Sequence, residues 1–224
     1  MITSSAWGGA LAALPLIVVV VALLMPAPSP PNPLIKAAVH GRLAELDRRS
    51  VETTLDDVRD DHGNTLLHWA AKAGQVDVCR YLIDRRTDPA ITNRAGTTAL
   101  HWAVYSPEHG SDIIEILLNA GVNPNSINHN RESALHWAVD WDRPNSVEAL
   151  LRHGADPNLV DNHGDGPLHR IQRDCTESSS CAATLKLLLK HGANAAAVND
   201  AGRAALAHID WDYDATQKET AASV

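Results

Sequence analysis

The chain has 224 residues, of which 45% are hydrophobic and 21% charged, and these near-average values exclude a disordered or collagen-like protein. The 27 acidic residues outnumber the 19 basic ones, which gives a net charge of −8 and excludes the basic surface that nucleic-acid binding requires. Three cysteines are too few for a small disulfide-rich scaffold. We therefore expect an ordinary folded protein with no nucleic-acid partner.

The N-terminal segment is apolar and carries no charged side chain from Thr3 to Met25. Residues 6–25 match the ~20 residues that cross a bilayer, whereas the apolar core of a signal peptide is only about 7–15 residues long. We predict an uncleaved membrane anchor, in a hydrophobic helix within residues 1–25. A signal peptide is the alternative, although the start has no basic side chain and Pro28 follows Ala27 where cleavage would be expected. A buried soluble helix is a third interpretation.

Residues 26–33 contain five prolines, which favours an extended spacer between the anchor and the next domain. Two signals disagree about the side of the membrane on which that domain lies. The basic residues that follow the apolar run, beginning with Lys36 and Arg42, favour the cytoplasm. Cys175 and Cys181 bracket a short polar loop, a pattern typical of a disulfide in an oxidising compartment, although two free thiols are the alternative. We favour the disulfide and an extracytoplasmic, periplasmic location.

A Leu-His pair recurs along the chain at nearly constant spacing. The four histidines are 33, 35 and 33 residues apart, and they are His68, His101, His136 and His169. A second apolar run follows each pair, and a glycine turn follows most of these runs. Each unit therefore reads as a helix, a turn, a second helix and a long loop, and it cannot bury its apolar face alone.

The segment Gly96-Thr-Thr-Ala-Leu-His-Trp-Ala103 and its copies resemble the ankyrin repeat, which has a period of about 33 residues and the signature Thr-Pro-Leu-His-x-Ala. The resemblance implies an all-α ankyrin-repeat solenoid of about six helix-turn-helix units including caps. We expect an N-terminal capping repeat over 34–59, four repeats over 60–198, a degenerate C-terminal capping repeat over 199–213 and a disordered tail over 214–224.

Local signals agree with these units and also mark weak points. Thr65, Thr98 and Ser133 are residue types that cap the start of a helix. Arg86 and Arg131 stand where the other copies carry the glycine of a turn, so the turns there are less certain.

No motif of an active site occurs, so we predict that the chain is not an enzyme and has no cofactor, metal site or small-molecule substrate. The resemblance implies that the four motif histidines support turns by hydrogen bonding near the motif threonine. His62, His129 and His163 fall at loop tips, where a row of imidazoles could sense pH or bind a metal; solvated tip residues are the simpler interpretation.

The resemblance also implies that binding uses a concave face, built from the loop tips and the first helix of each unit. Tyr105, Trp141 and Trp211 are large aromatic residues on that projected face, and they could instead fold onto the neighbouring repeat. The other predicted binding residues are Lys72, Asp140, Arg173, His62, Asn64, Arg94, His129, Glu132, His163 and Asp165, within a wider face that includes Thr97, Asn130, Asn162, Asp174 and Asp212.

We thus expect a membrane-tethered, monomeric module that binds a protein partner as a scaffold or adaptor. A stoichiometric inhibitor, such as an immunity protein that masks a toxin, is an alternative, and a metal-responsive protein that uses the tip histidines is another.

Overall fold

The computed structural model describes residues 32–50, 54–171 and 180–207, and helices dominate these residues. The N-terminal apolar segment, the loop with Cys175 and the C-terminal tail lie outside the described residues. The elements are α2 (Pro33–Val39), α3 (Leu43–Arg49), η1 (Leu55–Asp57), α4 (Leu66–Lys72), α5 (Val76–Asp84), α6 (Ala99–Ala103), α7 (Gly110–Asn119), α8 (Ala134–Asp140), α9 (Pro144–Arg152), η2 (Pro167–Arg170) and α10 (Ser180–Lys190).

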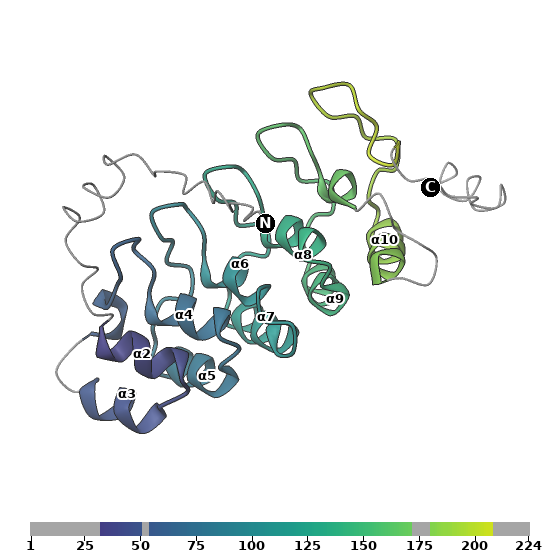
Figure 1. The fold of residues 1–224 in the computed structure, drawn as a ribbon. Coiled ribbons are helices and arrows are strands. Elements are labelled where there is room, and N and C mark those ends of the chain that lie inside the picture. The colour runs from purple at the N-terminus through teal and green to yellow at the C-terminus, as the bar shows by residue number, and fades with distance from the viewer. Residues whose placement is uncertain (1–31, 51–53, 172–179, 208–224) are drawn as a thin grey trace, which may run out of the picture. The chain divides into compact units, whose positions relative to one another are not determined.

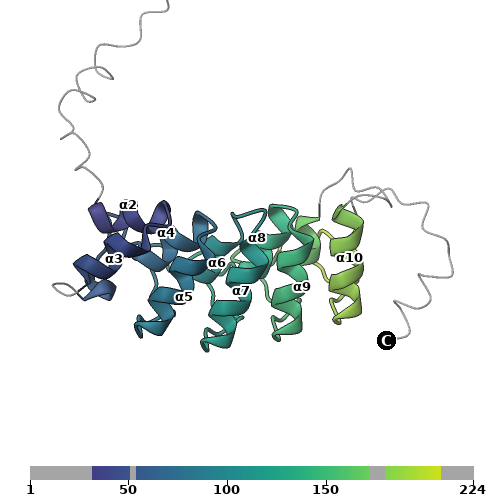
Figure 2. The same ribbon diagram turned by 90° about the horizontal axis from the view of Figure 1, so that it is seen from below.

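The helices pair into successive units that stack side by side (Figure 1). The first helices, α2, α4, α6, α8 and η2, form one row, in which each contacts the next. The second helices, α3, α5, α7, α9 and α10, form the other row, as Figure 2 shows from below. Long loops connect the units and extend on one side of the helices (Figure 1). This arrangement confirms the predicted all-α solenoid of stacked helix pairs, and none of the described helices is long and apolar enough to cross a membrane.

One continuous core runs through the stacked units. The leucine of each motif is buried, and alanines one turn later, such as Ala70 and Ala103, let neighbouring first helices approach closely. The second helices contribute larger apolar side chains, among them Leu82 and Leu117, together with the fully buried Cys79. Because every unit buries its apolar face against its neighbours, its stability depends on them.

The predicted helix caps are present. At the start of α4 the backbone N–H of His68 donates to the hydroxyl of Thr65, and the ring of His68 in turn accepts the backbone N–H of Thr65. One half of this arrangement recurs at α6 and α8, where the backbone N–H groups of Thr98 and Ser133 donate to Nδ1 of His101 and His136 at 3.2 and 3.1 Å. Each cap satisfies amide groups that the first turn of a helix leaves without a partner.

The motif histidines also join each unit to the next. The Nε2 atom of His68 lies 2.9 Å from the carbonyl oxygen of Thr97, and Nε2 of His101 lies 3.1 Å from that of Glu132. His136 reaches the carbonyl of Asp165 at 3.2 Å in the same way. Because a carbonyl oxygen can only accept, Nε2 carries the proton, and Nδ1 accepts from the cap.

Burial keeps these three histidines neutral. Desolvation lowers the pKa of His68, and it lowers the pKa of both His101 and His136 to about 4. The hydrogen bonds from the three rings to carbonyl oxygens oppose this shift without reversing it. The motif histidines are therefore structural connectors between repeats.

The two turns in which arginine replaces glycine keep the turn geometry. Arg86 and Arg131 adopt left-handed backbone angles, with φ of 60° and 62°, at positions where the other units place glycine. A residue with a β-carbon pays roughly 1 kcal/mol for this conformation, so the repeat pattern overrides the local preference of the arginine.

Candidate protein-binding face

A row of tryptophans follows the motif histidines along the first helices. Trp69, Trp102 and Trp137 each pack part of the indole against the core. The indole N–H groups donate to the adjoining loops, to the carboxylates of Asp60 and Glu132 and to the hydroxyl of Thr97, each at 3.1 Å. The loops therefore fix the orientation of these rings, which are partly buried packing residues.

Tyr105 and Trp141 extend this row into what we call the aromatic strip, made of Trp69, Trp102, Tyr105, Trp137 and Trp141. The ring of Tyr105 meets Trp137 edge-on with centroids 5.5 Å apart, and it meets Trp141 at 5.1 Å. Trp69 and Trp102 make a similar contact at 5.3 Å. Tyr105 thus folds onto the next repeat and is half-buried, whereas Trp141 keeps 48% of its surface exposed.

Lys72 lies against the first part of the strip. Its Nζ atom is 5.5 Å from the ring centroid of Trp69, 5.0 Å from that of Trp102 and 5.4 Å from that of Tyr105. All three rings attract the ammonium group through their negatively polarised faces. The side chain remains exposed, and it forms no salt bridge among the described residues.

At the other end of the row, an arginine takes the place of the tryptophan. The guanidinium of Arg170 lies 2.9 Å from a carboxylate oxygen of Glu132 and 2.5 Å from oxygens of both Asp140 and Asp161. These four residues, which we call the Arg170 cluster, come from two successive units. One positive and three negative side chains give the cluster a formal net charge of −2, and all three carboxylates share the one guanidinium.

The four groups respond to this environment in different ways. Burial raises the pKa of Asp140, although the Arg170 guanidinium opposes the rise. Burial also works against the charged forms of Glu132 and Asp161, but donated hydrogen bonds outweigh it and lower the pKa of both. For Arg170, burial disfavours the charge, yet the surrounding carboxylates raise the pKa. Asp140 is thus the carboxylate of the cluster whose charged form burial disfavours most clearly.

The loop tips are built on a repeated side chain that the sequence reasoning missed. The side-chain oxygen of Asp60 accepts the backbone N–H groups two and four residues later, each at 2.9 Å. The same pattern recurs at Asn93, Asn128, Asp161 and Asn199. The spacing Asp/Asn-x-x-Gly, present in four of the five loops, is the signal that could have identified this turn.

Successive tips are also tied together through the backbone. The N–H of Arg94 donates to the carbonyl of His62 at 2.9 Å, and the N–H of His129 donates to that of Ala95 at 3.0 Å. The later loops repeat this bond, so the tips form a connected surface.

The described predicted binding residues lie in exposed, half-buried or buried positions. His62, Arg94, His129 and His163 are exposed at the tips, together with Asn130 and Asn162, and Lys72, Asp140 and Trp141 are exposed on the first helices. Tyr105, Glu132 and Asp165 are half-buried. Trp211, Arg173, Asp174, Asp212 and Cys175 lie outside the described residues, so the predicted disulfide to Cys181 stays a prediction.

The predicted exposure of two tip residues is wrong. Asn64 is only 3% exposed, because its amide donates to the carboxylate of Asp60 and its oxygen accepts from the amide of Asn93. Thr97, also 3% exposed, holds the indole of Trp102 and the ring of His68. Both side chains stabilise the loops and do not face a partner.

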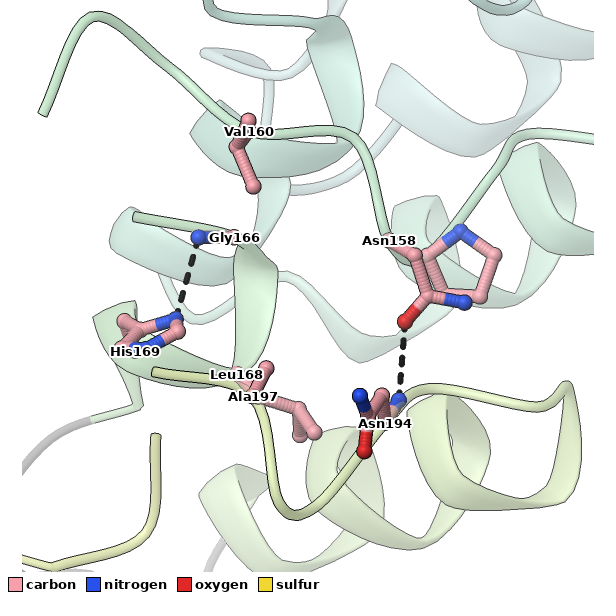
Figure 3. A pocket seen from close by; sticks show the side chains of 8 residues that line it. Asn158, Val160, Gly166, Leu168, His169, Asn194 and Ala197 are labelled. Atoms are coloured by element: carbon pink, nitrogen blue, oxygen red, sulfur yellow. Dashed lines mark hydrogen bonds between the residues drawn. The ribbon is translucent and has the colours of Figure 1, made fainter. Parts of the chain in front are cut away.

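A cavity of about 270 Å³ lies between the last two described units (Figure 3). Its lining is mostly apolar and consists of Pro157, Asn158, Val160, Gly166, Leu168, His169, Asn194 and Ala197. Nδ1 of His169 accepts the N–H of Gly166 at 3.0 Å, but its buried Nε2 has no hydrogen-bond partner among the described residues. Within the described ranges no three potential metal ligands lie together, so this region does not resemble a metal centre.

Comparison with known proteins identifies the class to which this fold and face belong. The family model "Ankyrin repeats (3 copies)" matches residues 18–93, 34–128 and 86–161, and the chain is therefore a member of the ankyrin repeat family. Ankyrin repeats are protein-interaction modules, and membership implies a binding role for this chain.

Individual relatives agree with this assignment. An ankyrin repeat domain from Acinetobacter baumannii AYE is similar in structure, with a TM-score of 0.69 and 26% identity over 79% of this chain and 89% of that domain. The integrin-linked protein kinase homolog pat-4 of Caenorhabditis elegans is 39% identical over 77 residues, and the palmitoyltransferase Hip14 of Drosophila melanogaster is 33% identical over 92 residues. These matches cover 31% and 40% of this chain but only 16% and 14% of those proteins.

Proposed function

We propose that the chain is a membrane-tethered, non-enzymatic scaffold or adaptor that binds a protein partner through the aromatic strip and the adjoining loop tips. The observation that carries this proposal is Trp141, a large aromatic side chain that remains 48% exposed at the end of a row of ordered rings. Exposed aromatic residues on a rigid support are common anchors of protein interfaces, because they bury much area at little entropic cost.

The test is parallel affinity capture by the wild-type protein and by Trp141→Ala, followed by quantitative mass spectrometry. Tyr81→Ala is a matched control, because Tyr81 is a half-buried aromatic residue of the second-helix row, where it donates to Asp47 at 3.1 Å. We expect at least one protein to be lost about tenfold with Trp141→Ala and retained with Tyr81→Ala. Circular dichroism must show both variants folded. Equal capture by all three proteins would refute the proposal.

The activity of a captured partner distinguishes a scaffold from a stoichiometric inhibitor. A scaffold leaves the activity of its partner unchanged, whereas an inhibitor abolishes it at a one-to-one ratio. Sedimentation of the isolated repeats tests the expectation that they are monomeric.

The membrane tether is supported by the composition of residues 6–25, which contain no charged side chain. We expect the full chain to sediment with membranes and a chain that begins at residue 32 to remain in the supernatant. Identical fractionation of the two proteins would exclude residues 1–31 as the tether. Alkylation of intact cells, with and without reductant, tests the periplasmic location, because a disulfide between Cys175 and Cys181 protects both thiols until reduction.

A further inference from the structure

Lys72 presents an ammonium group that its surroundings orient but do not neutralise. Three ring faces lie within 5.5 Å of Nζ on the side of the strip. Among the described residues no carboxylate pairs with this group and no hydrogen bond uses its donors. Since an ammonium has three N–H donors, those that face away from the rings are directed to solvent or to a bound molecule.

The charge differs along the strip. Lys72 lies at the end formed by Trp69 and Trp102, where the indole N–H of Trp69 also donates to the carboxylate of Asp60. The Arg170 cluster, with a formal net charge of −2, adjoins Trp137 through Glu132. A negatively charged group that approaches this face is therefore attracted to Lys72 and repelled from the Arg170 cluster.

The surface between these ends is aromatic. Tyr105 contacts Lys72 on one side and Trp141 on the other, with distances of 5.4 Å to the ammonium and 5.1 Å between the ring centroids. A continuous path of contacts thus leads from the positive charge to the exposed indole, and a large apolar side chain placed on it would be held next to the ammonium.

We propose that the aromatic strip receives a protein segment in which a carboxylate pairs with Lys72 and a neighbouring large apolar side chain packs on Tyr105 and Trp141. This inference rests on the proposed function and adds the chemistry of the partner. A carboxylate fits better than a phosphate, because phosphate groups are commonly held by clusters of arginines, whereas this end of the strip offers one ammonium.

The orientation of the bound segment follows from the charges. Its acidic residue lies at the Trp69–Trp102 end, and any basic residue lies toward Asp140, whose side chain is exposed beside Trp141. A segment with the reverse order would place like charges together at both ends, so the strip selects one direction of binding.

The experiment selects binders from a displayed library of random peptides on the immobilised protein, with the double variant Tyr105→Ala and Trp141→Ala for counter-selection. Sequencing gives the composition of the peptides that require the strip. Their affinities are then measured for wild type, Lys72→Glu, and the control Lys186→Glu, which alters an exposed lysine of α10. Thermal melts must show all variants folded.

We expect strip-dependent peptides to be enriched in Asp or Glu beside a large apolar residue. Lys72→Glu should weaken them about tenfold, Lys186→Glu should leave them unchanged, and replacing the acidic residue of the peptide by lysine should restore binding to Lys72→Glu. Strip-dependent peptides without an acidic residue, or with unchanged affinity for Lys72→Glu, would overturn this inference and leave the proposed function standing. A selection that yields no strip-dependent peptide would count against both.

Discussion

The junctions between the earlier units and the last described junction use the same Leu-His pair with different results. His68, His101 and His136 each reach a carbonyl oxygen of the following unit. Nε2 of His169 is instead buried beside a cavity of about 270 Å³, and no residue that the structure describes pairs with it. The helix that carries His169 is also a 3₁₀ segment of only four residues. A motif histidine therefore stabilises a junction only where the next loop supplies its acceptor, so its contribution belongs to a pair of units.

The same two regions differ in how they fill the position after the histidine. The earlier units place a tryptophan there, and the rings contact one another or the neighbouring histidine edge-on, as Trp102 does with His68 at 5.7 Å. The later unit places Arg170, which collects carboxylates from two preceding loops and from α8. Aromatic packing gains from burial directly, whereas the ion cluster is stable only while every charge keeps its partners.

The largest effect on stability is expected from Arg170→Met. This change leaves Glu132, Asp140 and Asp161 close together without a cation, and breaking a buried ion cluster in this way typically costs about 3–5 kcal/mol. Urea unfolding measures the loss. The matched control is Arg152→Met, which removes an exposed ion pair with Glu115 and should cost less than about 1 kcal/mol. Equal losses in the two variants would show that the cluster adds no stability.

Acidification should weaken the junctions that contain neutral histidines. The pKa of His101 and His136 is about 4 in the folded protein and near 6.5 when unfolded, so the unfolded chain binds more protons as the pH falls through this range. Stability is therefore full above about pH 6.5 and declines toward pH 4, by about 2–4 kcal/mol in total at pH 5. Urea unfolding at pH 7 and pH 5 tests this.

A variant pair assigns this pH dependence to a residue. In His101→Leu the free energy of unfolding should decrease less between pH 7 and pH 5 than in the wild type. Replacing the exposed His191 by glutamine should leave this decrease as large as in the wild type. A decline that is unchanged in His101→Leu would assign it to other groups.

Replacing the motif histidine at two different junctions compares their contributions to stability at constant pH. His101→Leu removes the acceptor for the Thr98 cap and the donor to Glu132, and we expect a loss of about 2–3 kcal/mol. His169→Leu removes the acceptor for the backbone N–H of Gly166, but among the described residues its Nε2 has no partner to lose, so we expect a smaller loss of about 1 kcal/mol at neutral pH. Calorimetry or urea unfolding compares the variants, and a greater loss for His169→Leu would reverse our interpretation of the last junction.

The smallest effect concerns the cation on the aromatic strip. Lys72→Met keeps most of the aliphatic length but removes the attraction between the ammonium and three rings, which is worth about 0.5–1 kcal/mol at an exposed position. Lys186→Met is the corresponding change in α10. A melting temperature lowered only in Lys72→Met would confirm that the rings hold the cation.

The sequence predicted the features that depend on one unit and its period. The family, the stacked helix pairs and the caps at Thr65, Thr98 and Ser133 follow from local patterns that repeat along the chain. The Arg170 cluster could not be predicted, because it joins residues from separate units, and neither could the three rings around Lys72.

The error at Asn64 has the same origin. A polar residue at a loop tip suggests exposure, but the burial of Asn64 depends on its hydrogen bonds to Asp60 in its own loop and to Asn93 in the next loop. The sequence of one repeat shows only the first of these two partners. The spacing between repeats does not show which side chains of neighbouring loops are in contact.

Cys79 offers a direct way to time the opening of an individual repeat. Burial raises the pKa of its thiol to about 12, and the side chain is fully enclosed on α5. Since a thiol reagent attacks the exposed thiolate, modification of Cys79 requires α5 to detach from its neighbours. The ratio of its labelling rate to that of a free thiol then gives the population of the opened state under native conditions, without an engineered labelling site or a denaturant.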